Sequence, residues 1–246
     1  MFTGTAEAGS TVTLFVDNSP ISTTVANSDG SFSLTSSELA DNNYGITFTA
    51  TDRAGLESDI SASTSIQIDT TFPNIPSITT TTTATNDITP TIEGTAEAGS
   101  TVELFNGDTS LGTATAESDG SFSITTGELA DDDYSLTVTA TDAAGNTSSA
   151  STALALTIDT AAPEAPVITT TTDLTNDPNP VIQGTAEAGS TVTLLSGDTS
   201  LGTATADANG AFSITSSELA DNSYTLTVKS TDAAGNESAE SAGLEI

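Results

Sequence analysis

Apolar residues alternate with threonine and serine in short segments along the whole chain. The middle part shows this most clearly, for example in Thr-Val-Glu-Leu at 101–104 and in Tyr-Ser-Leu-Thr-Val-Thr-Ala at 134–140. A period of two, with enrichment in Val, Ile and Thr, predicts β-strands that have one buried face. Glycine-containing turn sequences separate the segments. We expect seven short strands in this part, including segments at 78–83, 91–96, 101–104, 121–124, 134–140 and 154–158.

The pattern is repeated three times. The nine residues Gly-Thr-Ala-Glu-Ala-Gly-Ser-Thr-Val begin at Gly4, Gly94 and Gly184, so each copy starts 90 residues after the last. Such a period indicates tandem structural units. Seven strands in about 90 to 100 residues are typical of an immunoglobulin-like β-sandwich. The predicted fold is therefore all-β, with tandem immunoglobulin-like β-sandwich domains in an elongated array.

A tyrosine in each unit supports this fold. Tyr44, Tyr134 and Tyr224 are the only tyrosines, and each ends a Leu-Ala-Asp-x-x-Tyr sequence just before a long predicted strand. This position matches the tyrosine corner of immunoglobulin-like domains, in which the hydroxyl group bonds to nearby backbone. A core aromatic residue without that bond is the alternative interpretation.

Proline pairs mark the predicted domain boundaries. Pro73 and Pro76, and then Pro163 and Pro166, stiffen two short linkers. We predict the first repeat at 1–69, without its N-terminal strand, the second at 70–159 and the third at 160–246, with a shortened C-terminal end. From the phase of the repeat, we expect both ends of the chain to be boundaries within a longer array.

The charge of the chain limits its partners. It has 34 acidic residues against Arg53 and Lys229, for a net charge of −32. Phosphate contacts are made largely by lysine and arginine, so nucleic acid and anionic membranes are unsuitable partners. We expect no membrane insertion, and metal cations are the natural counter-charge.

Catalysis is also disfavoured by composition. The chain has no cysteine and no histidine, which removes disulfides, thiolate chemistry, histidine acid–base catalysis and the usual zinc and haem sites. A carboxylate pair could serve a glycosidase. However, only 4% of residues are aromatic and none is tryptophan, so a sugar-stacking platform is difficult to build. We predict no catalytic residues and no enzyme activity; Ser230 and Lys229 point to opposite faces of a strand.

The chain resembles the bacterial immunoglobulin-like repeats of giant surface adhesins, including the type I-secreted RTX adhesins. The resemblance covers the whole chain and is carried by five segments in the middle unit: 94–102, 111–116, 119–122, 129–131 and 139–146. It implies extender modules of an extracellular stalk on the bacterial cell surface, with a role in biofilm adhesion. It also implies Ca²⁺ near the domain junctions, neighbouring repeats of the same polypeptide as partners and an adhesive target bound elsewhere. We expect the chain to be monomeric.

The fold places several acidic residues near each predicted junction. In a sandwich, three loops lie at the same end as the linker from the preceding domain, and each carries a carboxylate. Hard cations take 6–8 oxygen ligands, and carboxylates from several segments supply them. We therefore predict calcium ligands at Asp69, Glu97, Asp119 and Asp142, and at Asp159, Glu187, Asp207 and Asp232, of which Asp207 is displaced by two residues in its turn.

A junction of this kind would be a hinge locked by a cation, flexible without the metal and stiff with it. The alternative is a solvated acidic surface, which we favour for Asp131, Asp132 and Asp133. Asn146 and Asn236 could add an amide oxygen, although asparagine after glycine more often only makes the turn. The first repeat has Leu56 at this position.

Two other functions remain open. One is a calcium-dependent glycan-binding module, against which the low aromatic content counts. The other is a repeat unit of an extracellular filament, in which the first repeat accepts a strand from another chain at its open edge.

Overall fold

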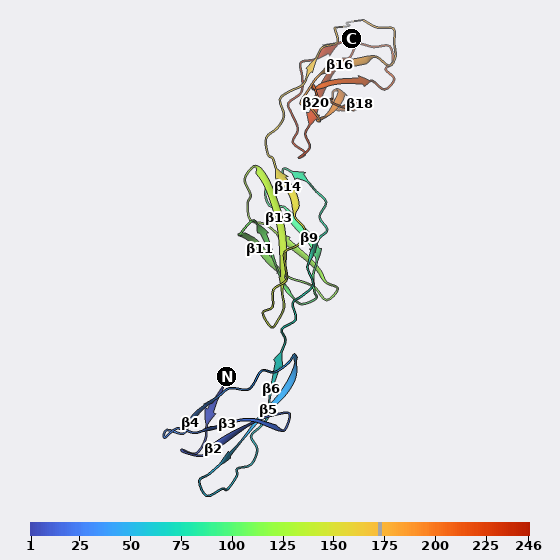
Figure 1. Cartoon of the computed structure of the whole chain (residues 1–246). Coiled ribbons are helices and arrows are strands. Elements are labelled where there is room, and N and C mark those ends of the chain that lie inside the picture. The colour runs from blue at the N-terminus through green and yellow to red at the C-terminus, as the bar shows by residue number, and fades with distance from the viewer. Residues whose placement is uncertain (172–173) are drawn as a thin grey trace. The chain divides into compact units, whose positions relative to one another are not determined.

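The computed structural model describes residues 1–171 and 174–246, and this part of the chain contains β-strands and no helix. Strands of each repeat form two sheets (Figure 1). The predicted all-β, tandem immunoglobulin-like fold is thereby confirmed. The chain forms two compact units, one of Met1–Pro73 with Thr141–Ser148 and the other of Asn74–Ala140 with Ser149–Ile246.

The first repeat has a two-stranded sheet and a four-stranded sheet. The smaller sheet pairs β1 (Phe2–Thr5) with β4 (Ser31–Leu34). The larger sheet has the order β3 (Ser19–Val25), β2 (Thr11–Val16), β5 (Asn42–Thr51) and β6 (Thr64–Ile68).

The middle repeat has one more strand in each sheet. The first sheet has the order β12 (Ser121–Thr125), β9 (Thr91–Thr95) and β7 (Ser77–Ile78). The second has the order β11 (Thr109–Thr115), β10 (Thr101–Asn106), β13 (Asp132–Thr141), β14 (Leu154–Ile158) and β8 (Ala84–Thr85).

The third repeat follows the same plan. One sheet has the order β15 (Val167–Ile168), β16 (Val181–Thr185) and β19 (Ala211–Thr215). The other has the order β18 (Thr199–Thr205), β17 (Thr191–Ser196), β20 (Thr225–Thr231) and β21 (Leu244–Glu245).

The continuous strand expected at 78–83 is wrong, because only Ile78 of this segment lies in a strand, β7, and the next strand, β8, begins at Ala84 in the other sheet. β7 pairs antiparallel with β9, whereas β8 pairs parallel with β14. Between them, the Thr80 side chain replaces part of the ladder: its Oγ1 accepts the amide of Glu93 at 2.8 Å. A threonine run with uniform alternation does not reveal this change of sheet.

The alternating apolar residues fill the space between the two sheets. Leu104 and Leu136 are fully buried in the middle repeat, as are Leu194 and Leu226 in the third. The middle and third repeats each have one main core cluster. In the first repeat the core is divided, because Leu14 and Val12 belong to separate clusters.

In the part of the chain that the structure describes, Tyr44 and Tyr134 form tyrosine corners. The hydroxyl groups of Tyr44 and Tyr134 donate to the carbonyl oxygens of Ala40 and Ala130, each at 3.0 Å. The core-aromatic alternative is thus excluded for these two residues. Tyr224 holds the equivalent position, and its backbone exchanges two hydrogen bonds of 2.9 Å with Ile246.

Candidate metal-binding loops

The loop after β13 folds around the carboxylate of Asp142. Its Oδ1 accepts the amides of Ala144 at 2.8 Å and Asn146 at 2.9 Å, and its Oδ2 accepts the side-chain amide of Asn146 at 2.8 Å. Gly145 supplies the left-handed backbone conformation of this turn, with φ 95°. The Asn146 side chain, opposed by desolvation and aided by backbone amides, holds the pKa of Asp142 below its ordinary value.

The loop after β20 repeats this arrangement. Asp232 Oδ1 accepts three backbone amides, and its Oδ2 accepts the Asn236 side chain at 2.8 Å. Burial acts to raise the pKa of Asp232, but the hydrogen bonds from Asn236 and the loop amides outweigh it and lower that pKa. Both carboxylates therefore organise their own loops.

The same asparagines reach the linkers. Asn146 Nδ2 also donates to the carbonyl oxygen of Asp69 at 3.0 Å, and Asn236 Nδ2 donates to that of Asp159 at 2.8 Å. Asp69 follows β6, and Asp159 follows β14, so each bond joins a loop to a linker 77 residues earlier. The sequence suggested an oxygen ligand or a simple turn residue, whereas the structure uses these amides as donors. The one available signal was that asparagine occupies this position in two repeats and Leu56 in the first.

An aspartate of the preceding repeat also bonds each linker. Asp41 accepts the Thr70 amide at 3.1 Å and the Thr70 hydroxyl at 2.8 Å, and the Thr71 hydroxyl at 3.0 Å. These bonds, led by the Thr70 hydroxyl, lower the pKa of Asp41. Asp131 accepts Thr160 in the same manner, with the hydroxyl at 3.0 Å. Asp131, Asp132 and Asp133 are exposed, but Asp131 bonds the linker and Asp133 accepts the Thr157 hydroxyl.

The remaining predicted ligands are also involved in local bonds. Asp69 Oδ1 accepts the Thr71 amide at 3.0 Å, and Asp159 Oδ1 accepts the Ala161 amide at 2.9 Å. Asp119 accepts both the hydroxyl and the amide of Ser121, and these two bonds, the hydroxyl bond most of all, lower the pKa of Asp119.

The last three predicted ligands follow the same trend. Asp207 accepts the amides of Asn209 at 2.8 Å and Ala211 at 2.9 Å. Glu97 and Glu187 are exposed, and each bonds through its backbone carbonyl to a serine hydroxyl at 2.7 Å.

Within residues 1–171 and 174–246, no three acidic side chains lie close enough together to form a metal-binding group. Asp69 and Asp142 share a partner in Asn146, as Asp159 and Asp232 share Asn236. The oxygen atoms that could bind a metal here belong to carboxylates and backbone carbonyls, which are the ligands that calcium prefers. The eight-residue calcium set stays a prediction.

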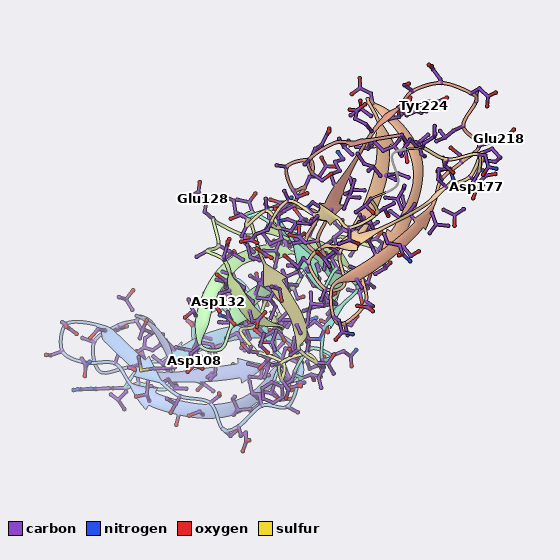
Figure 2. All side chains as sticks on the ribbon, turned by 90° about the horizontal axis from the view of Figure 1, so that it is seen from above. Asp108, Glu128, Asp132, Asp177, Glu218 and Tyr224 are labelled. Carbon is purple, nitrogen blue, oxygen red and sulfur yellow. The ribbon has the colours of Figure 1, made fainter. Side chains whose placement is uncertain are left out.

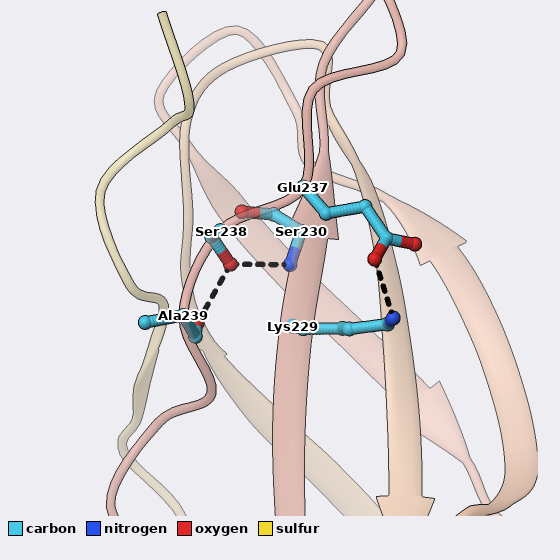
Figure 3. A network of polar contacts seen from close by, with 5 residues as sticks. All are labelled: Lys229, Ser230, Glu237, Ser238 and Ala239. Carbon is cyan, nitrogen blue, oxygen red and sulfur yellow. Dashed lines mark hydrogen bonds and ion pairs between the residues drawn. The ribbon is translucent and has the colours of Figure 1, made fainter.

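Several other acidic residues are exposed (Figure 2). Asp108 lies in a turn, Asp132 begins β13, and Glu128, Asp177 and Glu218 lie in loops. One of the two cationic side chains, Lys229, forms an ion pair with Glu237 at 2.8 Å (Figure 3). Ser230 beside it is buried, and its backbone amide bonds the Ser238 hydroxyl at 2.9 Å, so Lys229 and Ser230 face different surroundings as expected.

Comparison with known proteins shows the family. The chain matches the bacterial Ig-like domain over residues 1–70, 77–160 and 168–246, and it belongs to this family. It is therefore a tandem array of bacterial immunoglobulin-like sandwiches. In the part that the structure describes, no helix has the length and apolar character needed to cross a membrane.

One curated relative is Exoglucanase B of Cellulomonas fimi, 32% identical over 189 residues; these cover 72% of this chain and 17% of that protein. The chain thus spans about a sixth of the relative's length. Among solved structures, it is similar to the BSP domain of a biofilm associated protein, at 20% identity, 84% coverage of this chain, 42% of that chain and a TM-score of 0.29. It is also similar to the fibronectin(III)-like modules of Clostridium thermocellum CbhA, at 17% identity, 70% and 93% coverage and a TM-score of 0.46.

Proposed function

We propose that the chain is a structural extender segment of a large bacterial cell-surface adhesin and has no catalytic role. The observation that supports it is the recurrence of the same linker bonds at both joins. Asn146 and Asn236 bond the carbonyl groups of Asp69 and Asp159, while Asp41 and Asp131 bond the threonines that follow. A linker bonded on two sides loses conformational freedom, which is what a spacer requires.

Membership of the bacterial Ig-like family is consistent with this role. Tandem units add reach almost linearly, because each contacts only its neighbours. A net charge of −32 keeps adjacent arrays soluble and apart. An extracellular location at the bacterial surface, with neighbouring repeats of the same polypeptide as partners, follows from the same proposal.

Calcium is the second part of the proposal. Asp69, Glu97, Asp119 and Asp142, with their counterparts Asp159, Glu187, Asp207 and Asp232, would hold Ca²⁺ after a local rearrangement of their loops. Two carboxylates at 4 Å repel by about 1 kcal/mol in water and about 4 kcal/mol at an effective dielectric of 20. A divalent cation reverses this repulsion and would tighten the linker beyond the asparagine bonds.

The test is a calcium titration of the chelated protein. We expect a rise in melting temperature, a change in maximum dimension by small-angle scattering, and two bound ions by calorimetry. The double variant Asp142→Asn, Asp232→Asn should lose these responses. Asp52→Asn, the equivalent change in the first repeat, is the matched control and should keep them. A titration without any of these responses would remove calcium from the proposal and leave the asparagine bonds as the stiffening element.

A second candidate is a calcium-dependent glycan-binding module. It is favoured by the relationship to Exoglucanase B, whose name indicates action on a polysaccharide. A glycan array probed with this chain, with and without calcium, distinguishes the two functions. Specific binding would favour the module, whereas a blank array would favour a spacer, in an adhesin or between the parts of a secreted enzyme.

A further inference from the structure

In the middle repeat, the first and last strands of the five-stranded sheet lie next to each other. β8 pairs with β14 in the parallel orientation at the edge of the sheet. The Thr157 amide donates to the Thr83 carbonyl at 2.9 Å, and the Asp159 amide donates to the Thr85 carbonyl at 3.1 Å. Backbone hydrogen bonds therefore join the N-terminal and C-terminal segments of this repeat directly.

The two strands of this pair are held unequally. β14 lies between β13 and β8, and its Leu156 and Ile158 side chains are buried in the core of the repeat. Ala84 and Thr85 of β8 are only half-buried. In the described part of the chain, no strand pairs with the other side of β8. β8 is therefore the strand that would separate from the sheet first.

The parallel orientation of β8 and β14 decides how the pair responds to a load. A force transmitted along the chain reaches β8 from its N-terminal side and leaves β14 on its C-terminal side. In a parallel pair these two points are at opposite ends of the contact, so the force acts along the strands. The hydrogen bonds run between the strands at even spacing, and such a force stretches them together. The pair is thus arranged to resist separation by a force along the chain.

One loop of the third repeat, at 232–236, bonds the ends of both strands. The Asn86 amide, directly after β8, donates to the Ala234 carbonyl at 3.1 Å. The Asn236 side chain donates to the carbonyl of Asp159, directly after β14, at 2.8 Å. Asp159 therefore donates to Thr85 in its own repeat and accepts from the following repeat. Because the loop is itself fixed by its carboxylate, its two bonds oppose separation of the strand ends.

We propose that β8 and β14 form a force-bearing clamp in the middle repeat, and that the loop at 232–236 of the third repeat stabilises this clamp. Under load, the middle repeat stays folded until β8 slides along β14. The bonds from the loop raise the force at which this sliding begins. The use of the clamp rests on the proposed extender role, since a stalk transmits load, but the strand pairing does not depend on that role.

Single-molecule pulling of the full chain in two geometries tests the clamp. The chain has no cysteine, so two introduced cysteines are the only attachment points for the handles. The variant Thr82→Cys, Ala161→Cys pulls the strands along their length, whereas Ile88→Cys, Ala161→Cys pulls both strands from their C-terminal ends. All three positions are exposed. We expect the first geometry to need roughly twice the force or more, because the bonds break together rather than one after another. Equal rupture forces would overturn the clamp.

A proline variant tests the contribution of the loop. Asn86→Pro removes the amide that donates to Ala234, and proline favours the extended backbone that Thr85 already has in β8. With the first pair of handles, the middle repeat should unfold about threefold to tenfold faster at the same force, as expected for the loss of one hydrogen bond. Asn176→Pro makes the equivalent change in the third repeat and should leave this rate unchanged.

Circular dichroism of both proline variants should match that of the parent chain, which shows that the middle repeat is folded before force is applied. An unfolding rate of Asn86→Pro equal to that of the parent, or an equal rise in Asn176→Pro, would overturn the part of the proposal that concerns the loop. Failure of the clamp would leave the extender role intact, because a spacer need not resist load. Absence of the protein from the bacterial surface would remove that role and leave the difference between the two pulling geometries unchanged.

Discussion

The side-chain amide of Asn146 donates to the backbone carbonyl of Asp69, 77 residues earlier, and to the carboxylate of Asp142 in its own loop. One side chain therefore organises a turn and binds the linker. Asn236 makes both bonds again with Asp159 and Asp232.

Replacement of this asparagine should release the linker. Asn146→Leu leaves the Asp69 carbonyl and one Asp142 oxygen without their donor, which should lower the free energy of unfolding by about 1–3 kcal/mol. Hydrogen exchange should increase at residues 69–71 and 142–146. The reciprocal change Leu56→Asn is the control, because Leu56 is 71% exposed. Unchanged exchange in Asn146→Leu would show that the bond does not restrain the linker.

Acid should loosen the same loops. The pKa values of Asp142 and Asp232 are lowered in the folded state, so their contribution to stability is present above the unfolded pKa of about 3.9 and is lost as pH falls through the folded value. The melting temperature should fall as pH is lowered below about 4. Asp142→Asn should make the fall shallower, whereas Asp108→Asn, on an exposed turn, should not. A parallel fall in all three proteins would contradict the assignment.

The pairing of β7 with β9 in the middle repeat should depend on Gly94. Gly94→Ala places a Cβ atom against the Ser77 carbonyl and the Phe122 ring, so β7 must move, at a cost of about 1–3 kcal/mol. Gly127→Ala is the matched control, since no atom lies within 4 Å of its added Cβ. Chemical denaturation measures both changes. Equal stability of the two variants would exclude a tight contact at Gly94.

The tyrosine corner should contribute one hydrogen bond. Tyr134→Phe keeps the ring and removes the donor to the Ala130 carbonyl, which should cost about 0.5–1.5 kcal/mol. Tyr44→Phe should have a similar effect in the first repeat, where the bond to Ala40 has the same length. Denaturation curves of both variants that overlay the parent curve would show that the bond adds nothing to stability.

Much of the fold was predictable because it depends on local pattern. The alternation at 134–140 places Leu136 and Val138 on one face, and both are fully buried in β13. The tyrosine position also transfers, since the hydroxyl of Tyr134 reaches only four residues back. The end of the strand after Ile78 was missed, because Thr80 bonds through its side chain, which the alternation does not record.

The candidate site was less predictable for a physical reason. Sequence phase can place Asp69 and Asp142 at the same end of a sandwich, but it does not show what their oxygens bond. Backbone amides nearby in the sequence compete for these oxygens. The amides of Thr71 and Ala144 donate to the carboxylates of Asp69 and Asp142, each two residues earlier. The long-range contact came instead from Asn146, whose role as donor to a distant carbonyl leaves no trace in composition or charge.

Asn146 and Asn236 bond the carbonyl groups of Asp69 and Asp159 at the same spacing in the sequence. The bonds at each linker between repeats are therefore supplied by the two repeats that flank it. Duplication or deletion of the middle period would leave every remaining join with an asparagine and a carbonyl partner. A lineage could thus lengthen or shorten such an array by recombination, without compensating mutations elsewhere.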